Sequence, residues 1–227
     1  MNPDKICFIV CYNDEIYLSE CILYLNQLIV PDGMETDLIS IEGAESMTSG
    51  YQAGMNASDA KYKVYLHQDT FILNRNFIYD MVNIFKENPD VGMLGMVGTK
   101  KLPENAVMWD SKDRVGALRS CSLNTVDDFF DIAIAQENNA NNTHTLKEVE
   151  AVDGLLMATQ YDINWREDLF KKWDFYDVSQ SFEFRKAGYK VAVPYQASPW
   201  VLHDCGFVNF TNYYKERDIF VKEYIVC

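Results

Sequence analysis

The sequence predicts an α/β fold with a mostly parallel central sheet and helices on both of its faces. Apolar runs typical of strands alternate with amphipathic helical segments through about the first 100 residues, and such a βαβαβαβ order is typical of parallel sheets. The first run, from Lys5 to Tyr12, is apolar almost throughout, as expected of a strand covered on both faces. With 227 residues, 48% of them hydrophobic, the chain can bury a sizeable core.

The first half of the chain contains the more regular elements. We expect strands at residues 5–12, 36–42, 63–69 and 91–99 and helices at residues 15–28, 46–60 and 74–88. Apolar residues recur at helical spacing in the first helix, and Pro89 stops the third because proline cannot continue a helix. Gly50 and Gly54 weaken the second.

The second half is less regular. A strongly polar run at residues 136–145 predicts a mobile loop, and a strand at 148–159 is interrupted at Asp153 and Gly154. A helix that ends at Gly188 leads into a strand, and the chain closes with a helix. The aromatic stripe on this last helix favours core packing first, and a dimer or membrane-surface contact second. It consists of Tyr213, Tyr214, Arg217, Phe220 and Tyr224.

No repeat, long linker or composition shift divides the chain. We therefore expect residues 1–227 to form one domain, with a nucleotide-binding half at about 1–100 and the remaining half, about 101–227, built onto the same sheet. The 20 basic and 34 acidic residues give a net charge of −14, which argues against binding nucleic acid or anionic lipid through bulk charge. A phosphorylated ligand would need a local helper such as a metal ion.

The chain shows no secretory signal and no apolar run near the ~20 residues that a membrane span needs. Its six cysteines form no CxxC pair, so reduced thiols and a cytoplasmic protein are expected.

His67 and Asp69 end the strand expected at residues 63–69. Residues two apart in a strand point to the same face, and the carboxyl ends of strands in a parallel sheet form the ligand-binding edge. The pair can therefore offer a nitrogen and an oxygen to one divalent cation. Equally well by spacing alone, His67 caps a strand and Asp69 starts a turn.

The first strand ends without a glycine-rich turn, which disfavours a dinucleotide fingerprint or a P-loop. Tyr12, Asn13 and Asp14 at this end, and Glu42 at the end of the second strand, can contact a base or ribose. Ordinary turn or helix-cap residues are the more common alternative for each of them.

Several segments resemble, in the same order, the inverting family-2-type glycosyltransferases of GT-A fold. The segments "FIVCYND", "ISIEGAES" and "YQAGMNASDAKYKVYLHQDTFI" resemble the first half of that family's domain. The resemblance places His67-Gln68-Asp69 where the family has an Asp-x-Asp-like metal motif. It also implies that Asn56 and Gln68 help to bind the donor.

Three later segments match in order: "VDGLLMATQYDINWREDLF", "FYDVSQSFEFRKAGYKVAV" and "WVLHDCG". The first resembles the acceptor-side strand and loop, which implies acceptor binding by Asp153 and Gly154 together with Tyr176. The second implies that Asp177 is the catalytic base, where spacing alone favours a helix N-cap. The third implies that His203 completes the metal site, the alternative being a strand-end histidine.

The resemblance covers nearly the whole chain and implies a function. It implies an inverting, hexosyltransferase-like enzyme of polysaccharide biosynthesis that uses Mn²⁺ or Mg²⁺, a UDP- or GDP-sugar donor and a glycan or lipid-linked acceptor. Such an enzyme would be cytoplasmic or peripheral to the inner face of the membrane. Trp109, Trp165 and Trp200 are able to stack on a sugar, although core burial is the default expectation for tryptophan.

Three departures from the family pattern favour a rival, a non-catalytic sugar-nucleotide or glycan-binding module of the same fold. His67 replaces a carboxylate, only Asp177 remains of three acids in the segment from Tyr176 to Gln180, and Glu183 stands where an arginine is usual. A metal-dependent nucleotide hydrolase is a third reading that no residue singles out.

Overall fold

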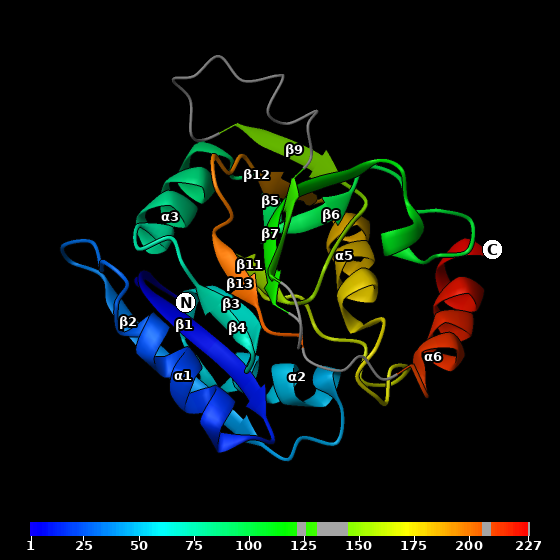
Figure 1. Cartoon of the computed structure of the whole chain (residues 1–227), viewed down its shortest axis with the longest axis horizontal. Helices are drawn as coiled ribbons and strands as arrows, with labels where there is room; N and C mark the ends of the chain where they lie inside the picture. The colour runs from blue at the N-terminus through cyan, green and yellow to red at the C-terminus, as the bar shows by residue number, and fades with distance from the viewer. Residues whose placement is uncertain (122–125, 131–144, 206–209, 227) are drawn as a thin grey trace.

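The computed structural model describes residues 1–121, 126–130, 145–205 and 210–226 (Figure 1). The polar loop expected at 136–145 lies, except for Thr145, outside the described residues. The helices are α1 (Glu15–Leu25), α2 (Met47–Ala57), α3 (Phe77–Glu87), η1 (Met108–Asp110), α5 (Tyr176–Lys186), α6 (Tyr213–Phe220) and the π-helical turn η2 (Val221–Ile225). The strands of the first half are β1 (Asn2–Tyr12), β2 (Glu35–Glu42), β3 (Ala60–His67), β4 (Thr70–Ile72), β5 (Val91–Gly95) and β6 (Val97–Thr99). Those of the second half are β7 (Arg114–Cys121), β8 (Val126–Phe130), β9 (Leu146–Val149), β10 (Ala151–Val152), β11 (Leu156–Thr159), β12 (Lys190–Pro194) and β13 (Val201–His203).

The main sheet confirms the expected α/β class. Its strand order is β2-β1-β3-β11-β5-β12-β9, with β1 parallel to β2 and β3, and β12 parallel to β5. In β1 the side chains of Ile6 and Val10 join one apolar cluster and those of Cys7 and Ile9 the other. This period of two buries both faces and explains the continuous apolar run.

The two apolar clusters correspond to the two helical layers seen in Figure 1. The first contains buried residues of α1 and α3, and the second contains buried residues of α2 and α5. Gly50 and Gly54, which weaken α2 as an isolated helix, allow it to approach β1 closely. A Cβ at Gly50 would meet the Cys11 sulfur, and one at Gly54 would meet Ile9.

Two features of the sheet differ from the sequence-based expectation. The strand expected at 91–99 breaks at Met96 into β5 of the main sheet and β6 of a second sheet, ordered β10-β6-β7-β13-β4 with β8 paired to β7. The strand expected at 148–159 becomes β9, β10 and β11. Of these, β11 runs antiparallel between β3 and β5, so the sheet is mixed at its centre.

The stripe on the last helix is mainly a packing surface. Phe220 is fully buried, and Tyr213 and Tyr224 pack against the same cluster, which includes Phe170 and Phe175. The core interpretation is therefore confirmed for these three residues. None of the described helices has both the length and the apolar character that a bilayer crossing requires.

Candidate active site

His67, Asp69 and His203 meet at the carboxyl edge of the main sheet. β3 ends at His67, and β4 begins at Thr70 after a two-residue turn. β13 pairs antiparallel with β4 and sets His203 opposite Thr70, which brings a histidine from the end of the chain next to Asp69. His67 Nδ1 lies 3.5 Å from His203 Nε2 and 3.8 Å from Asp69 Oδ1, and His203 Nε2 lies 3.4 Å from Asp69 Oδ1.

This three-residue cluster fits a divalent cation. The point equidistant from the three ligand atoms lies about 2.1 Å from each, which is the length of a metal–nitrogen or metal–oxygen bond. Asp69 Oδ1 is buried and has no hydrogen-bond partner, because the histidine nitrogens approach it without hydrogen-bond geometry. A buried carboxylate oxygen without a partner is costly, and a cation would satisfy it.

The protonation of the cluster follows from its geometry. Burial and repulsion from His203 lower the pKa of His67, which favours the neutral imidazole that a metal ligand requires. Burial raises the pKa of Asp69, but the contact with His203 and the charges of both histidines outweigh it and leave the pKa below its ordinary value. The cluster therefore offers an ionised carboxylate beside a neutral His67.

Tyr176 orients His67. Its hydroxyl contacts His67 Nε2 in a short hydrogen bond, so that Nε2–H can donate to the hydroxyl and leave the Nδ1 lone pair toward the cluster. Hydrogen bonds of this kind fix the tautomer and the ring orientation of metal-ligating histidines. Below it lie the buried rings of Tyr51 and Trp165, whose centroids are 5.0 Å apart. The Tyr176 ring contacts both of them.

Replacing Gly154 with alanine is expected to displace Tyr176. A Cβ at this position would overlap the Tyr176 hydroxyl and ring, so the ring must move away from His67. We expect a loss of about 1–3 kcal/mol in the free energy of unfolding from overpacking and about 10- to 100-fold weaker Mn²⁺ binding, measured by denaturant melts and calorimetric titration. Tyr176→Phe is the companion variant, because it removes the hydroxyl without overpacking. Unchanged Mn²⁺ affinity in both variants would contradict this role for Tyr176.

Asp177 is the second residue of α5. The helix N-cap is Phe175, which has the left-handed φ of 56° and no side-chain cap bond, so the N-cap alternative for Asp177 is wrong. A phenylalanine in this conformation is strained, and packing against Tyr213 and Phe220 holds it there. Asp177 Oδ1 accepts from the Val178 amide at 2.8 Å, and Oδ2 accepts from the Gly154 amide at 2.9 Å.

The environment of Asp177 suits a proton acceptor. Burial, followed by repulsion from Asp153, raises its pKa to about 7, although the two amide hydrogen bonds act in the opposite direction. A carboxyl group that titrates near neutral pH can take up a proton during a reaction and release it afterwards.

Asp153 links Asp177 to a tryptophan, a residue type for which core burial is the default expectation. Asp153 Oδ1 accepts from the Leu155 amide, and Oδ2 accepts from Trp109 Nε1 at 2.8 Å. Trp165 and Trp200 are buried as expected, but Trp109 is 39% exposed, so the core expectation is wrong for it. No local pattern reveals this, because its position depends on the pairing of β6 with β7.

The residues expected to bind the donor fall into two groups. At the site edge, Gln68 Oε1 accepts from the amides of Asn13 and Asp14, each at 3.0 Å. Asp14 itself caps α1. Tyr12 and Glu42 lie side by side in the β1–β2 register at the same edge. Asn56 is not brought there, because it lies near the end of α2, four residues before Ala60, which pairs with the start of β1.

Glu183, which stands where the family has an arginine, is engaged elsewhere. Its carboxylate accepts from the Tyr224 hydroxyl at 2.7 Å and pairs with Arg166 at 3.3 Å. Arg166 also pairs with Asp168 and Glu223. This network joins α5 to the last turn of the chain, so Glu183 makes a structural contact between these two elements.

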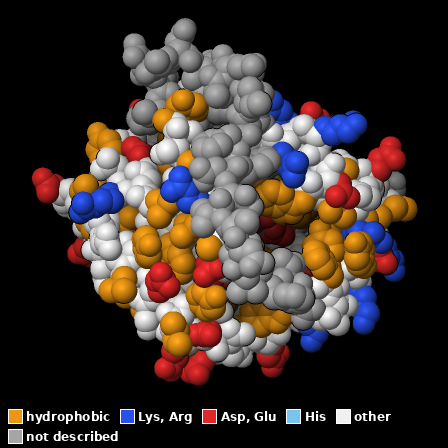
Figure 2. Space-filling view, viewed as in Figure 1, with side chains coloured by type: hydrophobic (Ala, Val, Ile, Leu, Met, Phe, Trp, Pro, Cys, Tyr) orange, Lys and Arg blue, Asp and Glu red, His pale blue; other side chains and the backbone are white. Residues whose placement is uncertain are grey.

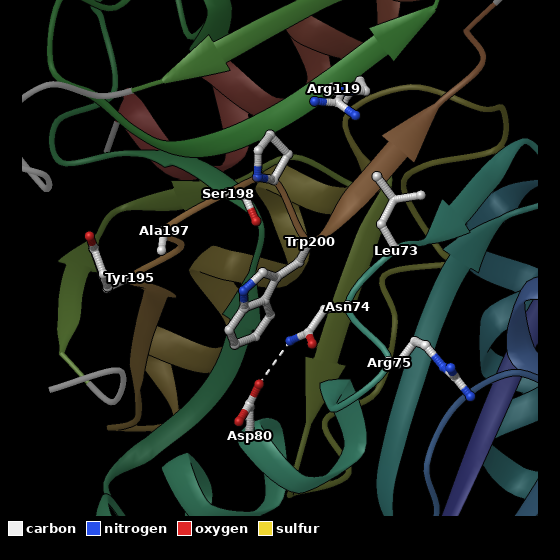
Figure 3. Close-up of a pocket in the computed structure, with 10 residues that line it drawn as sticks. Leu73, Asn74, Arg75, Asp80, Arg119, Tyr195, Ala197, Ser198 and Trp200 are labelled. Carbon is white, nitrogen blue, oxygen red and sulfur yellow. Dashed lines mark hydrogen bonds between the residues drawn. The ribbon is translucent and has the colours of Figure 1, made fainter. Parts of the chain in front are cut away.

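A separate pocket of about 450 Å³ lies at the other end of the β4–β13 pair (Figure 3). Leu73 and Trp200, which line it, are joined by a backbone hydrogen bond. The side-chain Nδ2 of Asn74 donates to Asp80 Oδ2 of α3 at 2.8 Å. None of the expected site residues lines this pocket, and about three residues of strand, or about 10 Å, separate it from the His67–Asp69–His203 cluster.

Comparisons with known proteins agree with this geometry. A family model described as "Glycosyltransferase like family" matches residues 7–224, whereas curated protein sequences give no significant match. The S. aureus TarS 1-349 structure in complex with UDP is similar, with a TM-score of 0.57 and 12% identity over 96% of this chain and 65% of that chain. Its complex with UDP-GlcNAc gives a TM-score of 0.55 and 9% identity over 96% and 66%.

The likeness to TarS concerns the fold, since the identities are low. The chain spans less than two thirds of the length of these structures. The family match runs from β1 to the last turn of the chain and contains every residue of the site described above. The mixed α/β sheet, the strand-edge cluster and this match together show that the chain belongs to the glycosyltransferase-like family.

Proposed function

We propose that this protein is an inverting, divalent-metal-dependent glycosyltransferase that uses a nucleoside diphosphate sugar. The observation that carries the proposal is the His67–Asp69–His203 cluster, whose spacing fits a metal ion and whose Asp69 oxygen is buried without a partner. In a protein with a net charge of −14, a diphosphate needs such a local positive charge.

The donor side of the site would use residues at the strand ends. His67, Asp69 and His203 would hold the cation, which when bound neutralises the diphosphate leaving group. Two imidazoles and one carboxylate favour Mn²⁺ over Mg²⁺, since Mg²⁺ prefers oxygen ligands. Gln68 fixes the loop of Asn13 and Asp14 through its hydrogen bonds, so that this loop can face the nucleoside. The UDP and UDP-GlcNAc complexes of the similar TarS structures support this class of donor.

The acceptor side would use Asp177. In a single displacement the acceptor oxygen attacks the anomeric carbon, the bond to the diphosphate breaks, and the acceptor proton passes to the Asp177 carboxylate. The amides of Gly154 and Val178 hold that carboxylate in place. One displacement inverts the anomeric configuration, and the nucleoside diphosphate is the leaving group.

Removal of the metal tests the proposal. The protein is incubated with UDP-glucose, UDP-GlcNAc or GDP-mannose and a mixture of 4-nitrophenyl glycosides, in Mn²⁺, in Mg²⁺ or in EDTA. We expect release of UDP or GDP together with a glycoside product in Mn²⁺, less in Mg²⁺ and none in EDTA. Proton NMR of the product should show the anomer opposite to that of the donor. Transfer that persists in EDTA, or a product of retained configuration, would refute the proposal.

A further inference from the structure

Trp109 is a partly exposed aromatic ring that is hydrogen-bonded to Asp153, a neighbour of the proposed base Asp177. It lies in η1, between β6 and β7, and its indole N–H donates to Asp153 Oδ2 at 2.8 Å. The Arg114 guanidinium lies 5.6 Å from its ring centre. Asp153 directly precedes Gly154, whose amide holds Asp177 at 2.9 Å. The ring is thus tied through one short segment to the proposed proton acceptor.

A second group of aromatic side chains also lies near Asp177. Tyr213, at the start of α6, packs its ring 5.0 Å from that of Phe175, two residues before Asp177. Phe210 packs 5.6 Å from Tyr213, and both Phe210 and Tyr214 are 56% exposed. Figure 2 shows hydrophobic side chains around a hollow that lies over α5 and beside α6, with an acidic side chain inside it. Exposed aromatic rings around an acidic base are unusual for a surface that faces only water.

The charges at this place are mainly negative. Burial raises the pKa of Tyr213, and the carboxylates close enough to raise it further are Asp177, Asp174, Asp110 and Asp153. Asp110 follows Trp109 in the chain and Asp174 precedes Phe175. Arg114 is a cation at the Trp109 ring, so the four carboxylates face at least one positive charge here. Such a potential repels an anionic acceptor and accommodates a neutral or cationic one.

We propose that Trp109 is the platform for the acceptor sugar, and that the acceptor is a neutral or amino-bearing saccharide. This rests on the glycosyltransferase function proposed above. The C–H face of a pyranose ring is apolar and is shielded from water on the flat indole, while its hydroxyls at the ring edge can donate to carboxylates such as Asp153. Stacking fixes the plane of the ring and so determines which hydroxyl reaches Asp177. An acidic saccharide has the same C–H face and differs only in charge. It is therefore the alternative acceptor that the test must exclude.

Three 4-nitrophenyl β-glycosides of one ring shape test the proposal: the glucoside, the glucosaminide and the glucuronide. Binding is measured by saturation-transfer difference NMR in the presence of UDP and Mn²⁺. We expect the glucoside and the glucosaminide to bind through their ring C–H protons, and the glucuronide to bind at least about tenfold more weakly. Trp109→Ala should weaken the first two by about tenfold, since an aromatic contact contributes up to about that factor, whereas Trp109→Phe keeps a flat ring and should lose less.

Two controls separate this proposal from the function on which it rests. Tyr79→Ala removes a ring that is 55% exposed on α3 and should leave glycoside binding unchanged. The affinity for UDP in Mn²⁺, measured by thermal shift, should be the same in the wild type, Trp109→Ala and Trp109→Phe. The same should hold for GDP. If no nucleotide binds the wild type, the proposed function fails. If nucleotide binds but the glycosides do not bind, bind Trp109→Ala as well as the wild type, or bind best as the glucuronide, the acceptor platform is refuted.

Discussion

Asp177→Asn is expected to lower sugar transfer by about 10²–10⁴-fold, which is the usual contribution of a positioned base. An amide cannot take up the acceptor proton at neutral pH. Because the cluster that would hold the donor uses different residues, His67, Asp69 and His203, the affinity for UDP or GDP in Mn²⁺ should barely change. Initial-rate assays and calorimetric titration with the nucleotide measure the two effects separately.

The structure also sets the stability expected of this variant. Asp177 accepts one amide hydrogen bond on each oxygen, but asparagine has only one acceptor oxygen. One of the two amides must therefore lose its partner, which costs about 1–3 kcal/mol, and the relief of repulsion with Asp153 offsets part of that loss. Wild-type transfer by Asp177→Asn would place the base elsewhere. Nucleotide binding by the wild type without transfer from any donor would favour the non-catalytic binding module.

The pH dependence offers a second readout for the same carboxyl group. Its folded-state pKa of about 7 lies above the ordinary value of 3.8, so between these values the folded protein binds more protons than the unfolded chain. The contribution of Asp177 to the free energy of unfolding is therefore largest below about pH 4 and falls as the pH rises toward 7. The rate should rise over the upper part of this range, because only the ionised form is a base. Asp177→Asn should lack both trends.

Much of the fold could be predicted because its signals are local. The strands at the centre of the first half bury both faces, so apolar runs such as Lys5–Tyr12 identify them without ambiguity. His67 and Asp69 could be identified as a site because they follow such a run at the ligand-binding edge of a parallel sheet. In both cases the information lies within about ten residues of sequence.

The remainder depends on pairings between distant segments. His203 reaches Asp69 only because β13 pairs with β4, about 130 residues earlier. The antiparallel insertion of β11 between β3 and β5 could not be predicted, since its apolar sequence fits either direction. The position of Trp109 follows from the second sheet, and Asn56 was misplaced relative to the cluster because α2 is oriented by its packing on β1. Local propensity carries no information on these long-range contacts.

The second large effect is expected from Asp69→Ala, which should abolish metal-supported donor binding. The variant removes the only carboxylate of the cluster and leaves two imidazoles, so the ion loses its one anionic ligand in the cluster, of a type that suits Mn²⁺ and Mg²⁺ alike. Without the ion, the diphosphate would face an acidic protein with no compensating charge. We expect UDP or GDP at about 100 times its wild-type dissociation constant to stabilise the wild type by about 2.7 kcal/mol in Mn²⁺ and to leave Asp69→Ala unchanged.

Without metal and nucleotide, the wild type should no longer be more stable than Asp69→Ala. Asp69 Oδ1 is buried without a hydrogen-bond partner, and removing such a group relieves a desolvation penalty. In EDTA at alkaline pH, where both histidines are neutral and no longer offset the burial of the Asp69 carboxylate, Asp69→Ala should therefore unfold at the same temperature as the wild type or at a higher one. This result would distinguish a site that binds a ligand from a site that stabilises the fold. Asp204→Ala is the matched control, since it removes a neighbouring negative charge that is outside the cluster and should retain the response to Mn²⁺ and nucleotide. Equal binding of UDP or GDP to Asp69→Ala and the wild type, or a loss of stability in EDTA as large as that of a buried ion pair, would mean that Asp69 serves the fold rather than the donor.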